Sequence, residues 1–466
     1  MNQHWAKDSL SPYLMRMNIP ATIVNAPQGR LAVPSVGGRR IGHAAHAAQS
    51  DSYVAASFIR WVFYAFVFSL PFETVNWGII EPPTILGGLL LLSTLFQPGL
   101  FLRWPSKGFW CFVVYLYLFA ILGALEFTRY GAELAHHLFL LAQLMILCWI
   151  ALNLMRDGRV AQTALLMLAV GCALLAILQV TGVASRATDV GARVVRVTAF
   201  GFHPNNLARI LALGLLALLG LTYGRGRSLI RPVYLAWPII ALTGVALVQT
   251  GSRGGLLALG AGLMVFMLRG RTLRSKIRNV LGVLLVLSLL TWVGLQSEST
   301  RLRFERTFAE GDFARREQIY PSAWRMFQER PLVGWGAVGS TYELGTRLGH
   351  PEEETKNPHN LILYALVSTG LLGAIPLLAG IAFAVQTAWK ARRGAHGMLP
   401  LMMIAAVLVA NMSGLWLFNK LHWLVMAYAL ASTHYIGAQQ SWSVVKRWRM
   451  SPEFEERERG AQQAQV

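Results

Sequence analysis

Apolar stretches of about 20 residues recur along almost the whole chain after residue 53. Each stretch, as a helix, is long enough to cross the roughly 30 Å of hydrocarbon in a bilayer. Helices are expected because the bilayer offers no water to backbone groups, and the stretches are too long and too little alternating for barrel strands. Only 14% of the 466 residues are charged, against roughly 25% in soluble proteins, so an ordinary soluble protein is excluded.

The sequence therefore predicts an all-α polytopic integral membrane protein with about 12 transmembrane helices. The predicted spans are 54–70, 78–96, 108–125, 133–155, 160–182, 205–223, 232–250, 254–269, 278–296, 360–387, 399–417 and 421–437. The predicted domains are a cytoplasmic N-terminal tail (1–53), transmembrane helices 1–9 (54–296), one large loop (297–359), transmembrane helices 10–12 (360–437) and a cytoplasmic C-terminal tail (438–466).

The distribution of Lys and Arg among the short loops predicts the orientation of the chain. Loops after even-numbered spans hold fifteen such residues, whereas short loops after odd-numbered spans hold six. Because basic residues are retained on the cytoplasmic side, the first set of loops and both termini are expected in the cytoplasm. The net charge of +20 would favour nucleic acid as a partner in a soluble protein, but here it follows the topology, and no nucleic acid is expected.

The segment from 297 to 359 is the one long loop between predicted spans, and it is expected on the periplasmic or outer side. Within it, 315–329 places Ile319, Trp324 and Phe327 at spacings that predict an amphipathic helix on the membrane surface. Pro321 is expected to confine or kink this helix.

Three arginines break the topology rule, because Arg193, Arg196 and Arg253 fall in short outer loops where positive charge works against insertion. Anion binding is the simplest explanation. The alternative is that each arginine reaches the interface along its own stem or pairs with a carboxylate such as Asp189.

Arg253 stands in a glycine-rich turn, Gly251–Gly255 (GSRGG), that leads directly into a predicted helix. Glycines let the backbone approach a ligand closely, and a helix N-terminus adds free N–H groups and a partial positive charge. A phosphate group would suit that position, although glycine-rich turns between spans are common.

Two further clusters stand immediately before predicted helices. In Asn357–Asn360 (NPHN), His359 lies near a helix N-terminus, where the dipole favours a neutral imidazole that can accept a proton. The alternative is an interfacial histidine with Asn357 or Asn360 as a helix cap. In 196–208 (RVTAFGFHPNNLA), capping alone would explain Asn205 and Asn206, but it leaves Arg196 unexplained.

Four motifs in this order resemble the O-antigen ligase family. They are Arg196–Ala208 (RVTAFGFHPNNLA), Ser252–Gly255 (SRGG), Arg316 followed fifteen residues later by Pro331–Gly336 (PLVGWG), and Pro358–Leu361 (PHNL). That family belongs to a superfamily with O-antigen polymerases and protein O-oligosaccharyltransferases. The resemblance covers roughly residues 190–375 and implies a GT-C-like fold with short helices in the large loop.

The resemblance implies transfer of preassembled O-antigen from undecaprenyl diphosphate to the lipid A core, in lipopolysaccharide biosynthesis. The enzyme would be a multi-pass protein of the bacterial inner membrane, in contact with membrane lipids and with its active site on the periplasmic face. A single direct displacement would invert the anomeric centre. No metal and no other cofactor is expected, because the outer loops offer arginines for the diphosphate and no compact acidic or His/Asp cluster.

The residue roles implied by the resemblance follow the motifs. His359 is the expected catalytic base, and Arg253 and Arg316 are the expected diphosphate ligands. Arg193, Arg196 and Asn360 are further candidates for substrate binding, the two arginines at phosphates of the core acceptor or at the donor. Many members of the family carry a glutamate just before the Gly-x-x-Gly of the tenth span, where this chain has Ser368-Thr369, so a second acidic base is not available there.

Other functions stay open at the level of sequence. An O-antigen polymerase or a protein O-oligosaccharyltransferase would share the arginines and His359 and differ only in the acceptor. A polytopic transporter would also have an even number of spans and inner termini, but it would carry acidic or histidine relays inside them. From the fifth predicted span onward, no Asp or Glu lies within an apolar core, which disfavours ion-coupled transport.

The fifteen-to-six distribution of basic residues predicts the result of cysteine labelling in intact cells. A cysteine introduced at Gln296, at the outer end of the ninth predicted span, should react with a membrane-impermeant reagent added from outside. A cysteine introduced in the loop around Arg271 should react only after the membrane is opened. The reverse pattern would overturn the orientation and every assignment of an outer site.

Overall fold

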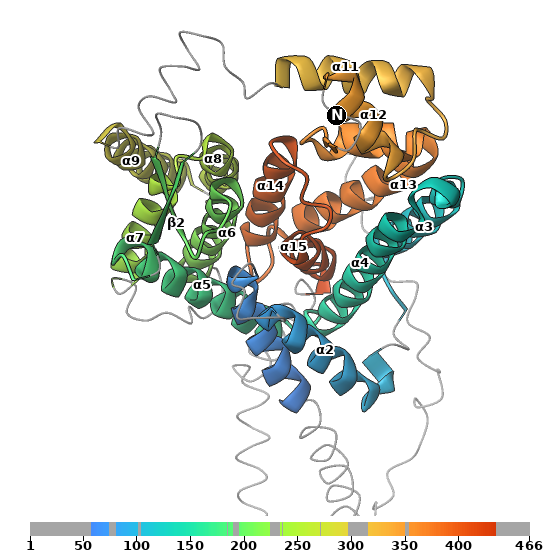
Figure 1. Ribbon diagram of the computed structural model, residues 1–466. Coiled ribbons are helices and arrows are strands. Elements are labelled where there is room, and N and C mark those ends of the chain that lie inside the picture. Colours follow the sequence, from blue (N-terminus) through green and yellow to red (C-terminus); the bar gives the residue numbers. More distant parts are fainter. Residues whose placement is uncertain are drawn as a thin grey trace, which may run out of the picture. The chain divides into compact units, whose positions relative to one another are not determined.

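Helices built from the predicted apolar stretches make up most of the protein (Figure 1). The structure is a computed structural model, and it describes residues 57–73, 81–100, 104–183, 185–189, 195–223, 234, 236–270, 272–296, 316–349 and 354–434. All of these residues belong to one unit, Val54–Val466.

The described helices follow one another along the chain in a simple order. They are an apolar helix Ser57–Phe72, which ends in the 3-10 turn η1 (Leu70–Phe72), α2 (Pro82–Leu95), the 3-10 turn η2 (Pro98–Leu100), α3 (Lys107–Ala124), α4 (Phe127–Leu154), α5 (Gly158–Val180), α6 (Pro204–Thr222), α7 (Ala236–Gln249), α8 (Arg253–Met267), α9 (Leu273–Gln296), α11 (Arg316–Glu329), α12 (Gly339–Arg347), α13 (Leu361–Ala391), α14 (Leu399–Met412) and α15 (Lys420–Ala431).

Each of the twelve predicted spans overlaps a helix in the described part of the chain. Five helices are long and apolar enough to cross a membrane by length and composition, namely α3, Thr128–Leu154 of α4, α5, α6 and α13. The predicted class, an all-α membrane protein, is therefore confirmed. The number of crossings, the cytoplasmic termini and the domain boundaries stay predictions.

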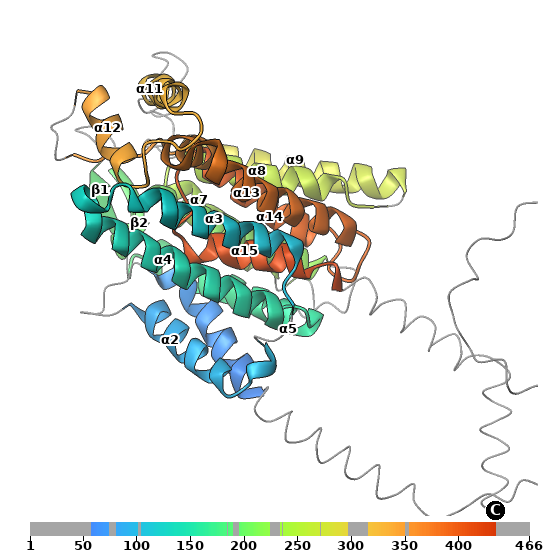
Figure 2. The ribbon, with the colours of Figure 1, turned by 90° about the vertical axis from the view of Figure 1, so that its right-hand side faces the viewer.

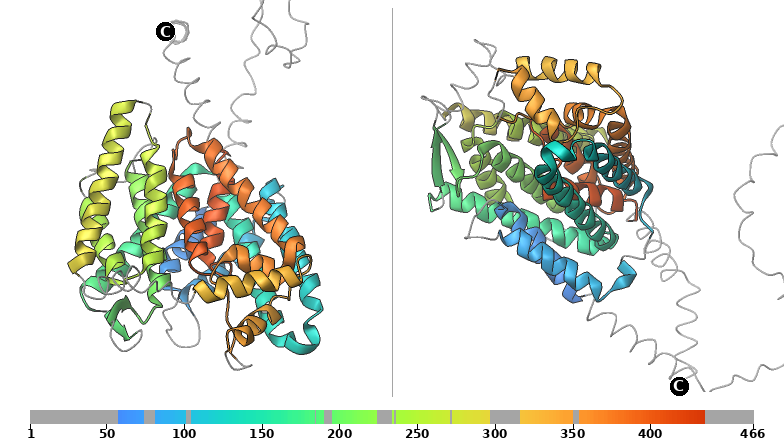
Figure 3. Two further views of the ribbon diagram at one scale, coloured as in Figure 1. Left: turned by 90° about the horizontal axis from the view of Figure 1, so that it is seen from above. Right: turned by 45° about the vertical axis from the view of Figure 1, so that its right-hand side comes forward.

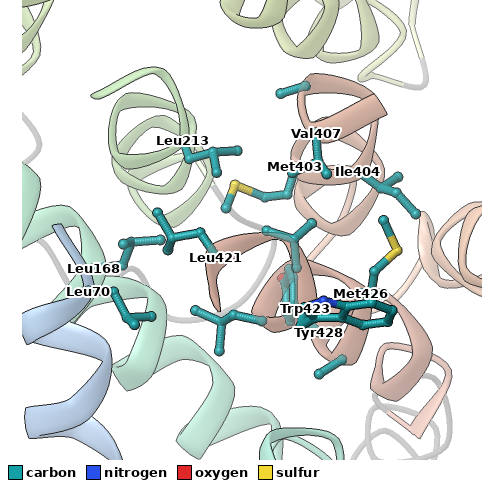
Figure 4. Packing of buried hydrophobic residues seen from close by; sticks show 14 of the residues in the cluster. Leu70, Leu168, Leu213, Met403, Ile404, Val407, Leu421, Trp423, Met426 and Tyr428 are labelled. Carbon is teal, nitrogen blue, oxygen red and sulfur yellow. The ribbon is translucent and has the colours of Figure 1, made fainter. Parts of the chain in front are cut away.

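Two helices form the centre of the apolar core. Every residue of α15 from Leu421 to Ala431 is buried, and so is almost all of α6. Figure 4 shows α15 side chains in one cluster with Leu168 of α5, Leu213 of α6 and Met403 of α14. A helix that is apolar on all sides is stable only when other helices surround it, which explains why α4, α13 and α14 pack around α15.

The two helices of the large loop, α11 and α12, lie at the same end of the long helices as a β-hairpin (Figures 2 and 3). The hairpin pairs β1 (Ser185–Asp189) with β2 (Val195–Ala199) in antiparallel register. The sequence did not predict it. The helix predicted at 315–329 is confirmed as α11, in which Pro321 lies near the N-terminus and Ile319 is buried, whereas Trp324 is exposed.

The long helix α13 is broken at Gly370, whose φ of 59° is left-handed. The loop that follows α11 pairs with this break through backbone hydrogen bonds. Trp335 N–H donates to Val367 O (2.7 Å), and Leu371 N–H donates to Pro331 O (2.8 Å). The break frees backbone groups that a continuous helix would satisfy internally, and the PLVGWG motif satisfies them instead.

Trp335 also holds the two loop helices together. Its Nε1–H donates to Met326 O (2.7 Å), and its ring lies beneath the guanidinium groups of Arg330 and Arg347, at 4.1 and 5.0 Å from the ring centre. Arg347 of α12 in turn makes two parallel hydrogen bonds to Glu329 of α11, each 2.6 Å long. The tryptophan of the motif is therefore a structural anchor.

α12 is fixed to α4 by polar and aromatic contacts. Glu126 Oε2 accepts a hydrogen bond from Gly339 N–H (2.6 Å) at the start of α12, where the helix dipole favours a carboxylate. Tyr342 stacks on Tyr130 with ring centres 4.9 Å apart, and its hydroxyl donates to Glu133 (2.8 Å). Burial raises the pKa of Glu126, and the hydrogen bonds that its carboxylate accepts from backbone N–H groups partly offset this rise.

Because α13 is broken at Gly370, adding one methyl group there should strongly destabilise the protein. A Cβ at Gly370 would overlap the carbonyl group of Leu332, and an L-residue there would also be strained at positive φ. Gly370→Ala should lower the free energy of unfolding by roughly 2–4 kcal/mol. Thermal denaturation of the purified protein in detergent would measure the change.

Gly88→Ala in α2 is the matched control, because no atom lies within 4 Å of a Cβ there. Its effect should stay within about 1 kcal/mol, since alanine favours a helix. Equal melting temperatures for the two variants would show that the loop does not depend on the break.

Candidate functional site

Three helices begin at residues that the motifs singled out. The N-caps are His203 for α6, Ser252 for α8 and Asn360 for α13, and each side chain accepts a hydrogen bond from the first turn of its helix. Asn360 is thus a cap, as one alternative had it. The expectation that Asn205 and Asn206 cap α6 is wrong, because the histidine before them holds that position.

The two asparagines of the first motif instead join α6 to other helices. Asn205 Oδ1 accepts from the hydroxyl of Ser252 (3.0 Å), at the start of α8. Asn206 Oδ1 accepts from Arg209 Nη1 (3.4 Å) and from Trp416 Nε1 (3.2 Å). Their amides therefore organise a polar centre that three distant parts of the chain share.

The glycines of the SRGG motif allow α8 to approach its neighbours closely. A Cβ at Gly255 would overlap Ala208 of α6, and one at Gly254 would lie 2.5 Å from the hydroxyl of Ser413. Small residues at helix contacts are the usual means of close packing in membranes. Because of this packing, Arg253 begins α8 directly beside α6 and Ser413.

Arg316 stands at the first position of α11 and contacts the end of α14. Its Nη2 donates to Ser413 O (2.9 Å), and Tyr320, one turn later, donates through its hydroxyl to Met412 O (2.9 Å). These carbonyl groups are among those that the end of a helix leaves without partners. The contacts hold the loop helix over the C-terminus of α14.

Arg209 is a member of this centre that the sequence reasoning missed. It is 4% exposed, its Nη2 donates to the hydroxyl of Ser413 (3.1 Å), and its guanidinium lies 5.7 Å from the ring centre of Trp416. The residue was visible in the sequence as an arginine inside the predicted span 205–223. An ionisable residue within a span is expensive and is commonly functional.

The segment after α14 was predicted wrongly in detail. The predicted span 399–417 ends as a helix at Met412, and its last residues form a non-helical turn. Asn411 fixes this turn, because its Oδ1 accepts from Trp416 N–H (3.0 Å) while its Nδ2 donates to Val407 O (2.9 Å) and to His422 Nδ1 (3.1 Å). Apolar composition alone did not reveal the turn.

His359 precedes α13 in an unusual backbone conformation. Its φ is 49°, and its N–H donates to Asn357 Oδ1 (3.0 Å). A left-handed conformation costs a non-glycine residue about 1 kcal/mol or more, and such strain is frequent at functional sites. The residue is solvent-exposed, so it is accessible to a substrate.

Electrostatics keep His359 neutral. Partial burial lowers its pKa from the ordinary value of 6.5, and the charges of Arg316 and Arg209 lower it further. His203 and Lys356 act in the same direction. The predicted base and the predicted ligand Arg316 are therefore close enough to influence each other, and the base is a proton acceptor at neutral pH.

The side chains of the two remaining predicted arginines are outside the described part of the chain. Arg193 is outside the described residues. Arg196 lies in β2 with its backbone paired to Thr188 of β1, but its side chain is outside the described part. Their substrate roles stay predictions.

The polar cluster, defined here as Asn206, Arg209, Arg316, His359 and Ser413, combines a neutral imidazole with guanidinium groups. In the described part of the chain, neither Arg209 nor Arg316 forms an ion pair with a carboxylate. Among the described residues there is also no group of three or more His, Cys, Asp or Glu that could hold a metal ion. Such an arrangement can bind an anion and accept a proton beside it.

The comparisons with known proteins agree with the motifs. The family model described as O-Antigen ligase matches residues 238–378. This segment includes Arg253, Arg316, the PLVGWG motif and His359, but neither Arg209 nor Ser413. A curated protein named O-antigen ligase, from Pseudomonas aeruginosa, is 26% identical to the chain over 262 residues.

That match covers 55% of the chain and 61% of the length of the relative. The four motifs, the helical membrane architecture and both comparisons point to the same family. The segment 238–378 is therefore similar to the O-antigen ligase family, in agreement with the resemblance of the motifs.

Proposed function

We propose that this protein transfers preassembled O-antigen from undecaprenyl diphosphate to the lipid A core oligosaccharide in lipopolysaccharide biosynthesis. The reaction takes place on the periplasmic face of the bacterial inner membrane, within reach of both lipid substrates, and needs no metal ion. The proposal is supported by the electrostatic effect of Arg316 on His359 and by the contact that holds Arg316 at Ser413, since both residues lie inside the segment that matches the O-antigen ligase model.

The chemistry assigns a step to each group. His359 takes the proton of the acceptor hydroxyl as its oxygen forms a bond to the anomeric carbon of the donor sugar. The bond from that carbon to the diphosphate breaks, and its electron pair leaves with the diphosphate. Arg253 and Arg316 stabilise the negative charge that develops there. Because the displacement takes a single step, the anomeric centre is inverted.

The orientation of two lipid-anchored substrates supplies a further part of the rate. Donor and acceptor are both held at the membrane interface, so the polar cluster needs only to align the hydroxyl, the anomeric carbon and the diphosphate. The backbone pairing between the PLVGWG loop and α13 supports this, since it joins the helix that follows His359 to the loop that follows Arg316 and α11.

Deletion of the gene, with lipopolysaccharide separated on gels, tests the proposed acceptor. Loss of a ligase should leave the lipid A core and remove all attached O-antigen. Loss of a polymerase would leave single repeat units on the core, and loss of a protein-directed transferase or a transporter of other solutes would leave lipopolysaccharide unchanged. Either of these patterns would refute the ligase assignment.

Arg253→Lys and Arg316→Lys should each lose most transfer activity although they keep the charge. A lysine cannot make the two parallel N–H bonds to phosphate oxygens that a guanidinium makes. Each loss should be about tenfold or more in kcat/KM, since hydrogen bonds to charged groups are the strong ones. An assay with purified protein and a lipid-linked donor measures it.

Arg392→Lys is the matched control, because that guanidinium bonds the backbone of its own helix at Trp389 and lies outside the polar cluster. It should transfer at the wild-type rate. Near-normal transfer by both site variants would reduce Arg253 and Arg316 to structural roles.

His359→Ala should lower the transfer rate by about 10² to 10⁴ while leaving folding and donor binding largely intact. His203→Ala should have a smaller effect, because His203 caps α6 and is not the proposed base. A His359→Ala variant that keeps more than roughly a tenth of the rate would exclude the base assignment.

The pH profile of transfer is a second test of His359 as the base. The rate should fall as the pH drops through the pKa of His359, which lies below 6.5 because burial and the two arginines lower it. Arg316→Gln removes one positive charge, so the pKa of His359 should rise and the acidic limb should move to higher pH. A limb that stays in place in this variant would contradict the proposed proximity.

A further inference from the structure

Arg209 is a buried cation near the start of α6, one of the two most enclosed helices in the described part of the chain. It lies in the second turn of α6, in which nearly every residue is buried, and it is itself 4% exposed. Removing a charged side chain from water is costly unless a group of opposite charge compensates it. A buried arginine at this position is therefore expected to have a compensating negative charge nearby.

The described surroundings of Arg209 do not supply one. Its hydrogen-bond partners are the amide of Asn206 and the hydroxyl of Ser413, and the ring of Trp416 lies beside it. All three are neutral. Its Nε is buried and has no hydrogen-bond partner among the described residues. The charge of Arg316 acts on Arg209, and it has the same sign.

Arg209 and Arg316 hold the same residue from two sides. Arg209 donates to the hydroxyl of Ser413, and Arg316 donates to its carbonyl oxygen. Two guanidinium groups brought together in this way repel each other, and an anion between them would remove the repulsion. A Cβ at Gly414 would overlap the guanidinium of Arg209. The glycine therefore leaves room for this guanidinium next to Ser413.

We propose that Arg209 is the buried member of the anion site and that, with Arg316, it binds a phosphate group that provides the missing negative charge. Under the proposed function, on which this identification rests, the phosphate belongs either to the donor diphosphate or to a phosphorylated acceptor. Arg209 and Ser413 lie outside the segment 238–378 that matches the family model.

The first experiment measures anion binding without any transfer reaction. Inorganic pyrophosphate is titrated into the purified full-length protein in detergent at constant ionic strength, and the melting temperature is followed. The wild type should be stabilised in a saturable way. Arg209→Met should need about tenfold or more pyrophosphate for the same shift, because it loses charged hydrogen bonds. Arg392→Met, which also removes one arginine but lies outside the polar cluster, should respond like the wild type.

Two outcomes overturn the proposal: a wild type that does not respond to pyrophosphate, and an Arg209→Met variant that responds equally well. Arg209→Met should fold, since an apolar side chain in place of a buried charge is often tolerated. If it does not, Arg209→Lys takes its place. That variant keeps the charge but not the fork, so it should also bind pyrophosphate more weakly, and wild-type binding by it would equally refute the proposal.

Transfer kinetics separate the two sources of phosphate. A raised KM for the lipid-linked donor in Arg209→Met, with an unchanged KM for the acceptor, assigns the group to the donor diphosphate, and the opposite pattern assigns it to the acceptor. Unchanged KM values for both substrates, with wild-type rates, would show that Arg209 does not bind either phosphate, while the ligase function would stand. Conversely, arginine-dependent binding of pyrophosphate would survive a failure of the gel experiment, so the two proposals fail separately.

Discussion

Ser413 is the residue on which the geometry of the site depends. It follows directly on α14, its hydroxyl accepts from Arg209 of α6, and its carbonyl accepts from Arg316 of α11. A serine here satisfies two cations with neutral oxygen atoms and introduces no carboxylate that would compete with a substrate anion. α6, α11 and α14 therefore meet at one small residue, and the positive charges of Arg209 and Arg316 are not neutralised by it.

The break in α13 has a complementary role on the side of the base. A continuous helix would leave the loop after α11 without these backbone partners. The break at Gly370 offers those partners, and the motif Pro331–Gly336 takes them. The same loop carries Trp335, which joins α11 to α12, while Glu126 and Tyr342 join α12 to α4. The arginine of α11 and the histidine before α13 are thus positioned by one connected set of contacts.

Much of the helical architecture could be predicted from the sequence, because crossing a bilayer imposes a simple rule: an apolar stretch of sufficient length must satisfy its own backbone. The helix at 316–329 could also be predicted, since its apolar residues recur at helical spacing. The β-hairpin could not, because its segments are short and carry no alternation strong enough to stand out. Nothing in composition separated the turn after Met412 from the span before it.

Within the site, residues that act through their own local motif were easier to predict than residues that act through distant contacts. His359 and Asn360 are defined by the start of α13, and their positions agree with the motif. Asn206 and Arg209 obtain their roles from Trp416 and Ser413, and no local pattern joins such partners. Asn206 therefore looked like a cap, and Arg209 was missed although its place in an apolar span marked it.

The distance along the chain between Arg209 and Ser413 also bears on biosynthesis. The two residues are 204 positions apart, and membrane proteins are made from the N-terminus onward. When α6 enters the membrane, Asn206 is already synthesised, while Ser413 and Trp416, the other described side-chain partners of Arg209, do not yet exist. The arginine stands close enough to the start of its helix to reach the aqueous interface along its own stem. Enclosure of this charge is thus one of the last events in assembly, and it requires nearly the whole chain.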